Sequence, residues 1–153
     1  MFRGMNTVSL DAKGRLAMPA RYRERLSNEH GGRLVATIDL DTRNRCLSLY
    51  LPGEWSSIER RIDAMSGLND QIRRMKHLLI GHANDLELDR IGRVLLPQEL
   101  RQYAGLEKQV CLVGQCKKLE IWSEQSWLKK RDEWLEEVHE QGALPEELRN
   151  LAL

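Results

Sequence analysis

The sequence has 153 residues, of which 41% are hydrophobic and 31% are charged, with a net charge of +1. These values exclude a disordered chain, and no apolar run approaches the ~20 residues needed to cross a bilayer. The first residues, MFRGMNTVSLD, lack the apolar core of a signal peptide. We therefore expect a cytoplasmic protein with no membrane partner.

Charge is distributed unevenly along the chain. Residues 1–34 carry a net charge of +4, whereas residues 132–153 carry a net charge of −6. This polarity predicts a basic working surface and an acidic appendage elsewhere. Solvated helix faces would produce the same charge runs, so the asymmetry supports a basic surface without defining it.

The cysteines predict reduced, buried structural thiols. Cys46, Cys111 and Cys116 are odd in number and do not have the spacing of a disulfide framework. A zinc site combining the last two with His77 and His82 would require spacings that zinc knuckles do not have. We expect no metal and no disulfide.

A thirteen-residue segment near the N-terminus is repeated 78 residues later. DAKGRLAMPARYR begins at Asp11 and DRIGRVLLPQELR begins at Asp89. Five positions are identical in one register: Asp11 and Asp89, Gly14 and Gly92, Arg15 and Arg93, Pro19 and Pro97, Arg23 and Arg101. This agreement indicates an internal duplication.

Each copy predicts a strand, a tight turn, a second strand and a short helix. NTVSL and NDLEL alternate polar and apolar residues as half-buried strands do. Gly14 and Gly92 close the turns at positions where the chain can take a positive φ. RLAM and RVLL are the second strands, and the prolines after them open helices, the second with Gly105 as its C-terminal cap.

A strand hairpin and amphipathic helices follow each repeat. RCLSLYLPGEW, from Arg45, corresponds to KKLEIWSEQSW, from Lys117, and the offset falls to 72. We place the extra residues of the first copy at NEHGG and DTRNR, where the second copy has a tight Gly114-Gln115 turn. Helical stripes then begin at Trp55 and Trp127, with a break at Ser66-Gly67 in the first copy. This helical spacing favours core or subunit contacts for the tryptophans over base stacking, and the tail QGALPEELRNLAL predicts a mobile segment.

No catalytic motif is present. The sequence has no Walker-type loop, no G-x-G-x-x-G after a strand, no G-x-S-x-G and no H-E-x-x-H. Asp11 with Arg15 and Asp89 with Arg93 are better explained as carboxylates that accept turn N–H groups than as catalytic pairs. We predict neither an enzyme nor a cofactor nor a small-molecule substrate.

The basic turns indicate binding instead. Lys13 and Arg15 in the first copy, and Arg90 and Arg93 in the second, lie beside glycine turns that leave backbone exposed. The arginine fork can hold a phosphate or the O6 and N7 atoms of guanine. From spacing alone, an equally good reading is that Arg15 and Arg93 only stiffen their turns.

MFRGMNTVSLDAKGRLAMPARYRERL, LLIGHANDLELDRIGRVLLPQELRQYAGL and VCLVGQCKKLEIW resemble the MraZ family of bacterial transcriptional regulators, which carry two SpoVT-AbrB-type units. The resemblance extends from Met1 to about Trp134, and the doubled D-x-x-x-R is its most specific feature. The DTRNR loop departs from the family pattern by being longer and more basic. This departure affects the expected geometry of the loop and not the resemblance to the family.

The resemblance implies an α+β fold class with a mainly β core: two tandem AbrB-like swapped-hairpin units forming one intrachain β-barrel with peripheral helices. We divide the chain into a first unit at residues 1–53, connecting helices at residues 54–80, a second unit at residues 81–124, and a C-terminal helix and acidic tail at residues 125–153.

The resemblance further implies a nucleoid-associated homo-oligomer, forming a ring, that binds double-stranded DNA at direct repeats. Those repeats would lie in the promoter of the division and cell wall gene cluster, including the protein's own gene, and binding would regulate transcription as a repressor does. The family's DNA-contacting arginine corresponds to Arg15, with Arg93 as its counterpart. Lys13, Arg90 and Arg3 are added as DNA-binding residues from their charge and their proximity in the sequence.

Two readings from other classes stay open. AbrB-like folds also occur in antitoxins, in which a C-terminal segment binds a partner protein, and the acidic tail here would suit such a protein-interaction module. Protease resistance of residues 124–153 would disfavour it, because antitoxin tails are extended. A scaffold without nucleic acid has less support, given Arg15 and Arg93.

Overall fold

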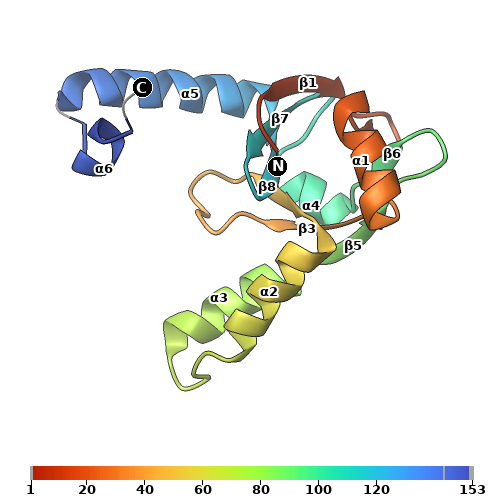
Figure 1. Ribbon diagram of the computed structural model, residues 1–153, viewed down its shortest axis with the longest axis horizontal. Coiled ribbons are helices and arrows are strands. Elements are labelled where there is room, and N and C mark those ends of the chain that lie inside the picture. The colour runs from red at the N-terminus through yellow and green to blue at the C-terminus, as the bar shows by residue number, and fades with distance from the viewer. Residues whose placement is uncertain (1, 143, 152–153) are drawn as a thin grey trace.

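The protein has a mixed helix and strand fold built on a large antiparallel sheet (Figure 1). The computed structural model describes residues 2–142 and 144–151. The strands are β1 (Met5–Ser9), β2 (Arg15–Ala17), β3 (Arg33–Ile38), β4 (Leu47–Tyr50), β5 (Asn84–Glu87), β6 (Arg93–Leu95), β7 (Gln109–Gln115) and β8 (Lys118–Ser123). The helices are α1 (Ala20–His30), α2 (Pro52–Asp63), α3 (Asp70–Gly81), α4 (Gln98–Tyr103), α5 (Glu124–Gln141) and α6 (Glu146–Arg149).

The two copies of the repeat are interleaved. Six strands form one sheet in the order β1-β7-β8-β4-β3-β5, and β2 and β6 form a separate two-stranded ribbon. The first copy supplies β1 to β4 and the second supplies β5 to β8, so β1 pairs with β7, β2 with β6, β4 with β8 and β3 with β5. The ribbon contacts both edge strands of the sheet, β1 and β5. The expected fold class, two swapped-hairpin units in one α+β fold with a mainly β core, is confirmed.

One hydrophobic core is shared by both copies. Leu16 and Val94 face each other across the ribbon and are fully buried, because alternate residues of a strand point to the same side. Leu26 of α1 and Leu100 of α4 close the same core. Each fully buried leucine contributes about 2 kcal/mol from burial alone. Since both copies supply these side chains, neither copy could form the core by itself.

The short helices begin where the prolines predict. Pro19 and Pro97 are the N-cap residues of α1 and α4, with φ of −52° and −56°. Each proline carbonyl accepts the first helical hydrogen bonds, for example from the Arg101 N–H at 3.1 Å. Gly105, just after α4, has a φ of +60°, as its predicted capping role requires.

The tight turn of the second hairpin lies one to two residues later than predicted. β7 continues through Gly114 and Gln115, and the chain reverses at Cys116, which has a φ of +61°. The prediction was wrong because the glycine at position 114 does not form the turn but leaves room for the N-terminal segment to cross β7. The N-terminal segment crosses it so closely that a Cβ there would lie 2.5 Å from the Arg3 Cα.

The three cysteines differ in their exposure to solvent. Cys46 and Cys111 are buried, and burial raises the pKa of both thiols. Cys116 is exposed at the hairpin turn, so the expectation of three buried thiols was wrong for this residue. It lies between Gln115 and Lys117, where the chain reverses and turns the side chain outward.

The predicted tryptophan packing is confirmed for the core positions. Trp55 and Trp122 are buried. Trp122 also packs edge-on against Trp127 and Trp134, with ring centroids 5.6 and 6.0 Å away. These contacts fasten α5 to the sheet as far along the helix as Trp134.

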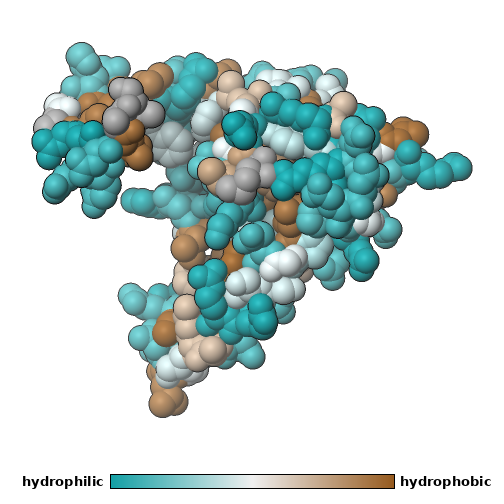
Figure 2. Space-filling view, in the orientation of Figure 1, coloured by the Kyte–Doolittle hydropathy of each residue, from teal (hydrophilic) through white to brown (hydrophobic). Residues whose placement is uncertain are grey.

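Two helical projections extend from the sheet in different directions (Figure 1). One is the α2–α3 hairpin, which turns at the predicted Ser66-Gly67 break. The other is α5, followed by the four-residue α6 within the tail, parts of which (143 and 152–153) lie outside the described residues. Apolar side chains are visible on both projections (Figure 2). Among the described helices, none has the length and apolar character that a membrane crossing would require.

Candidate nucleic-acid interface

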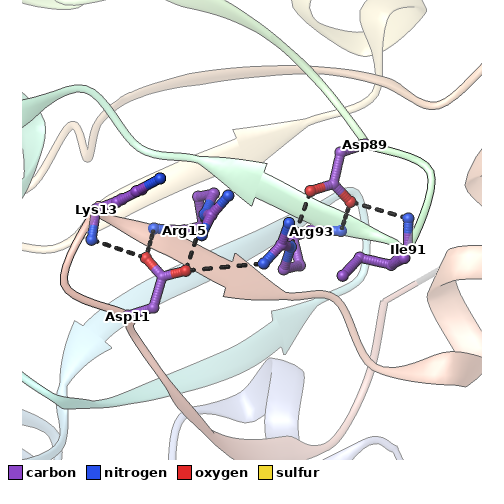
Figure 3. Close-up of polar contacts among 6 residues, drawn as sticks. All are labelled: Asp11, Lys13, Arg15, Asp89, Ile91 and Arg93. Atoms are coloured by element: carbon purple, nitrogen blue, oxygen red, sulfur yellow. Dashed lines mark hydrogen bonds and ion pairs between the residues drawn. The ribbon is translucent and has the colours of Figure 1, made fainter.

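The β2–β6 ribbon brings the two repeated turns together. The strands are antiparallel, with Arg15 opposite Leu95 and Ala17 opposite Arg93. Because Leu16 and Val94 point into the core, the alternate residues Arg15 and Arg93 lie on the outer face. Figure 3 shows their side chains next to each other between the two turns. Sequence segments 78 residues apart thus form one small surface.

Asp11 organises the first turn through three hydrogen bonds. Its Oδ1 atom accepts from the backbone N–H groups of Lys13 and Arg15, at 3.0 and 2.9 Å. Its Oδ2 atom accepts from the Arg15 Nε at 2.8 Å. The backbone N–H of Gly14, which has a φ of +87°, donates to the Asp11 carbonyl at 3.0 Å. The carboxylate therefore fixes both the backbone of the turn and the arginine that ends it.

The second turn repeats this arrangement. Asp89 accepts from the backbone N–H groups of Ile91 and Arg93, at 3.0 and 2.9 Å, and from the Arg93 Nε at 2.8 Å. Gly92 has a φ of +83°. One contact joins the two turns: Arg93 Nη1 lies 4.0 Å from Asp11 Oδ2 (Figure 3).

Both arginines are held through Nε and still face solvent. The side chains of Arg15 and Arg93 are each 30% exposed. A guanidinium bound through Nε keeps its Nη groups as donors, which is the edge that holds a phosphate or a guanine. Stiffening the turn and binding a ligand are therefore compatible roles of the same side chain.

The carboxylates of the turns are ionised at neutral pH. The backbone N–H of Arg15 holds the pKa of Asp11 below its ordinary value, helped by the guanidinium and by the Lys13 N–H, and opposed by desolvation. The pKa of Asp89 is lowered in the same way by Arg93 and Ile91. A lowered pKa in the folded state means that these contacts stabilise the turns at neutral pH and are lost as the solution becomes strongly acidic.

The structure brings together four of the five predicted DNA-binding residues. Lys13 and Arg90 are exposed in the two turns, beside Arg15 and Arg93. Arg3 is exposed but lies before β1, whereas the first turn follows that strand. The five residues of β1 separate them by about 16 Å. Arg3 therefore does not belong to the ribbon surface.

Two kinds of residue at this surface have no predicted role. Ile91 and Leu95 are apolar and more than half exposed, next to the arginines. Alternation along β6 places Leu95 on the same face as Arg93, which was a usable signal, whereas no pattern in the sequence distinguishes Ile91 from a core residue. Arg23 and Arg101 were identical positions of the repeat, which was a usable signal, but only the structure shows that each lies over the glycine of the opposite turn.

A second cluster of polar side chains is internal. Asp39, Cys46 and Glu120 place their ligand atoms within 4.8 Å of one another. Lys118 Nζ already contacts the Asp39 carboxylate and lies 3.3 Å from Glu120. Burial alone lowers the pKa of Lys118, but the hydrogen bond and charge of Asp39, together with Glu120, outweigh it and raise the pKa overall. An ammonium thus occupies the position of a cation, and we assign no metal to this cluster.

The fold and the paired turns define an AbrB-like swapped-hairpin protein with a basic ribbon. Comparison with known proteins agrees: the model of the family described as MraZ protein, antitoxin-like, matches residues 1–78 and 79–150. The "Transcriptional regulator MraZ" of Halorhodospira halophila is 51% identical over the full length of both chains. Proteins of the same name from Coxiella burnetii and Pseudomonas syringae are 49% and 48% identical, also over both full lengths. The chain belongs to the MraZ family.

Proposed function

We propose that this protein is a sequence-specific DNA-binding regulator of transcription and carries out no catalysis. The observation that carries the proposal is the position of Arg15 and Arg93 side by side on the outer face of one ribbon, with both side chains partly exposed. The names of the full-length relatives support it.

The chemistry of the ribbon suits a DNA groove. The charged side chains of the two turns, Lys13, Arg15, Arg90 and Arg93 with Asp11 and Asp89, have a net charge of +2. The guanidinium groups of Arg15 and Arg93 would hold guanine edges or phosphates. Lys13 and Arg90, which lie inside the turns, would hold phosphates. Ile91 and Leu95 offer apolar contact to thymine methyl groups.

The proposed operator is a set of direct repeats upstream of the protein's own gene, in the promoter of the division and cell wall gene cluster. Direct repeats suit a protein that presents several copies of one small surface. A single ribbon makes few contacts, and tethering several copies raises the effective concentration at adjacent sites. Repression and a cytoplasmic and nucleoid location are parts of the same proposal. So is the division into a first unit at residues 1–53, connecting helices at residues 54–80, a second unit at residues 81–124 and a C-terminal helix and acidic tail at residues 125–153.

We also propose that the protein assembles with further copies of itself into a ring. The α2–α3 hairpin carries a groove of about 410 Å³, lined by apolar residues such as Ile58, Ile62 and Met75 and flanked by Arg61 and Lys76. A head-to-tail contact between this groove and another surface of a second copy would close into a ring when the rotation allows it.

The second half of α5 is the surface that complements this groove. Leu135 and Val138 are well exposed, and residues 132–141 carry five acidic side chains and no lysine or arginine. Of the two cations that flank the groove, Lys76 is already paired with Asp63 at 3.0 Å, so the charge of Arg61 is the one that agrees with the acidic segment. Within one chain the two surfaces project in different directions (Figure 1), and an apolar face of this kind needs a partner. Trp55 does not contribute as an exposed contact, because it is buried in its own chain.

The regulator proposal is tested with purified full-length protein and the duplex immediately upstream of its gene, against a scrambled duplex of equal composition. We expect binding at least about tenfold tighter to the upstream duplex at physiological salt. We also expect affinity to fall steeply as salt rises, because each phosphate contact releases counterions. Equal affinity for both duplexes, or affinity that does not change with salt, would contradict the proposal.

The ring is tested by light scattering of the wild type and of a Leu135→Glu variant. The wild type should have the mass of several chains, and the variant should be smaller because a charge replaces an apolar contact at the proposed interface. Gln125→Glu adds the same charge at an exposed position in the first turn of α5, outside the proposed interface, and is the matched control for a small effect. A monomeric wild type would reject the ring.

The antitoxin reading is less well supported by the C-terminal region. An antitoxin tail that binds its partner by folding would be extended in the free chain. Here α5 is a continuous 18-residue helix, capped by Ser123 and held by the tryptophan cluster. The distinguishing observation is proteolysis of residues 124–153, which should be slow.

A further inference from the structure

Arg101 lies against the glycine of the opposite turn. Arg101 belongs to α4 in the second copy, and Gly14 belongs to the turn of the first. The guanidinium carbon of Arg101 is 2.5 Å from the position that a Cβ of Gly14 would occupy, and its Nε is 2.6 Å from the same point. A side chain at position 14 would displace Arg101. Glycine at position 14 therefore leaves the space that the Arg101 guanidinium occupies.

Arg23 repeats this contact in the other direction. It belongs to α1 in the first copy, and its δ-carbon and Nε lie where a Cβ of Gly92 would be. Two glycines with positive φ and two arginines therefore form two crossed contacts between the copies. The same four positions are identical in the repeat.

Each arginine is anchored on its own copy. Arg101 Nε donates to the carbonyl of Leu96 at 2.9 Å, and the N–H of Leu96 donates to the carbonyl of Gly14, also at 2.9 Å. In the other half, Arg23 Nη2 donates to the carbonyl of Met18 at 3.1 Å, and the N–H of Met18 donates to the carbonyl of Gly92 at 2.9 Å. One buried residue thus connects each arginine with the turn that the arginine covers.

We propose that Arg101 and Arg23 are positioning residues of the DNA-binding surface, each fixing the turn of the opposite copy. Arg101 acts on the turn that carries Lys13 and Arg15, and Arg23 acts on the turn that carries Arg90 and Arg93. This inference rests on the proposed DNA-binding function. It explains why the two basic turns form a single surface with one geometry, since each turn is held by an arginine whose anchor is in the other copy.

A lysine cannot take over this role, although it could replace an arginine that merely contacts phosphate. Arg101 donates through Nε to the Leu96 carbonyl while its guanidinium covers Gly14, and Arg23 donates through Nη2 to the Met18 carbonyl while its δ-carbon and Nε cover Gly92. A lysine has a single donor group at the end of a flexible stem and lacks the donor at the Nε position. Arg101→Lys and Arg23→Lys therefore separate positioning from charge.

The first measurement is amide hydrogen exchange of the full-length protein without DNA. Arg101→Lys should speed exchange of the Gly14 and Arg15 amides by about tenfold and leave those of Gly92 and Arg93 nearly unchanged. Arg23→Lys should give the reverse pattern. Two results would overturn the proposal. Faster exchange only in the turn of the copy that carries the substitution would indicate a local loss of stability. Equally faster exchange in both turns would indicate a global loss of stability.

The second measurement is binding to the duplex upstream of the gene, at low salt so that weak variants remain measurable. Arg101→Lys should weaken binding by about tenfold in the wild type and in Arg93→Ala, but by less than about twofold in Arg15→Ala, because both changes disable the same turn. An equal loss in Arg15→Ala and Arg93→Ala would identify Arg101 as an independent DNA contact and overturn the positioning role.

The results distinguish a failure of the proposed DNA-binding function from a failure of the positioning role. A wild-type protein that does not prefer its upstream duplex refutes the proposed function and the DNA role of these arginines together. Normal DNA binding without the crossed exchange pattern refutes only the positioning role.

Discussion

Arg15→Ala is expected to weaken binding to the upstream duplex by about 100-fold, and Arg93→Ala by a similar factor. One bidentate arginine contact discriminates by about 1–3 kcal/mol. Loss of the contact in every copy of an assembled protein multiplies the effect, because each copy contributes to simultaneous binding. The measurement is a titration at physiological salt with the wild type in parallel.

The structure indicates why this loss should come from recognition rather than from unfolding. Each guanidinium is part of an exposed turn, and its partner carboxylate keeps two backbone N–H donors after the arginine is removed. Surface ion pairs of this kind contribute little to global stability. The variants should therefore keep the unfolding transition and the mass of the wild type.

Arg43→Ala is the matched control for removal of a positive charge. The Arg43 side chain is 88% exposed and pairs with Asp41 in the loop between β3 and β4, away from the ribbon. It should change affinity by no more than about twofold. If Arg15→Ala and Arg93→Ala bind as tightly as this control, the two arginines only stiffen their turns and the DNA surface lies elsewhere.

The turns and the short helices could be predicted because the same sequence signals occur in both copies of the repeat. Gly14 and Gly92 mark the turns, and Pro19 and Pro97 mark the start of the short helices, through backbone preferences that need no distant contact. The pairing of strands between the copies came from the family resemblance. Hydrophobic alternation alone would also allow each copy to pair with itself.

The candidate site was only partly predictable for a related reason. The sequence places Arg15 and Arg93 in equivalent turns, but their adjacency depends on the antiparallel register of β2 with β6. Arg3 was assigned by charge and closeness in sequence, and a strand that separates sequence neighbours in space removes it from the surface. The crossed contacts of Arg23 and Arg101 depend on interleaving, which a list of motifs does not contain.

Lys118→Met is expected to lower the free energy of unfolding by about 3 kcal/mol. The lysine Nζ contacts the Asp39 carboxylate and is 3.4 Å from Ser48 Oγ, and the Asp39 side chain is only 8% exposed. Removal of one partner leaves a buried charge, which costs about 3–5 kcal/mol. We expect the lower end of this range, because the Lys118 side chain is still 23% exposed and Asp39 keeps hydrogen bonds from Ser48 and from the Asp41 N–H.

Lys117→Met tests whether this loss belongs to the buried charge. Lys117 is the adjacent residue and is exposed, so the same substitution there should change the free energy of unfolding by less than about 0.5 kcal/mol. Adding Asp39→Asn to Lys118→Met should restore part of the loss, because the neutral amide no longer needs a cation. Equal stability of the two methionine variants would contradict the account. Since Lys118 joins β8 of the second copy to the end of β3 in the first, a large loss would also show that charge pairing, as well as apolar burial, holds the interleaved copies together.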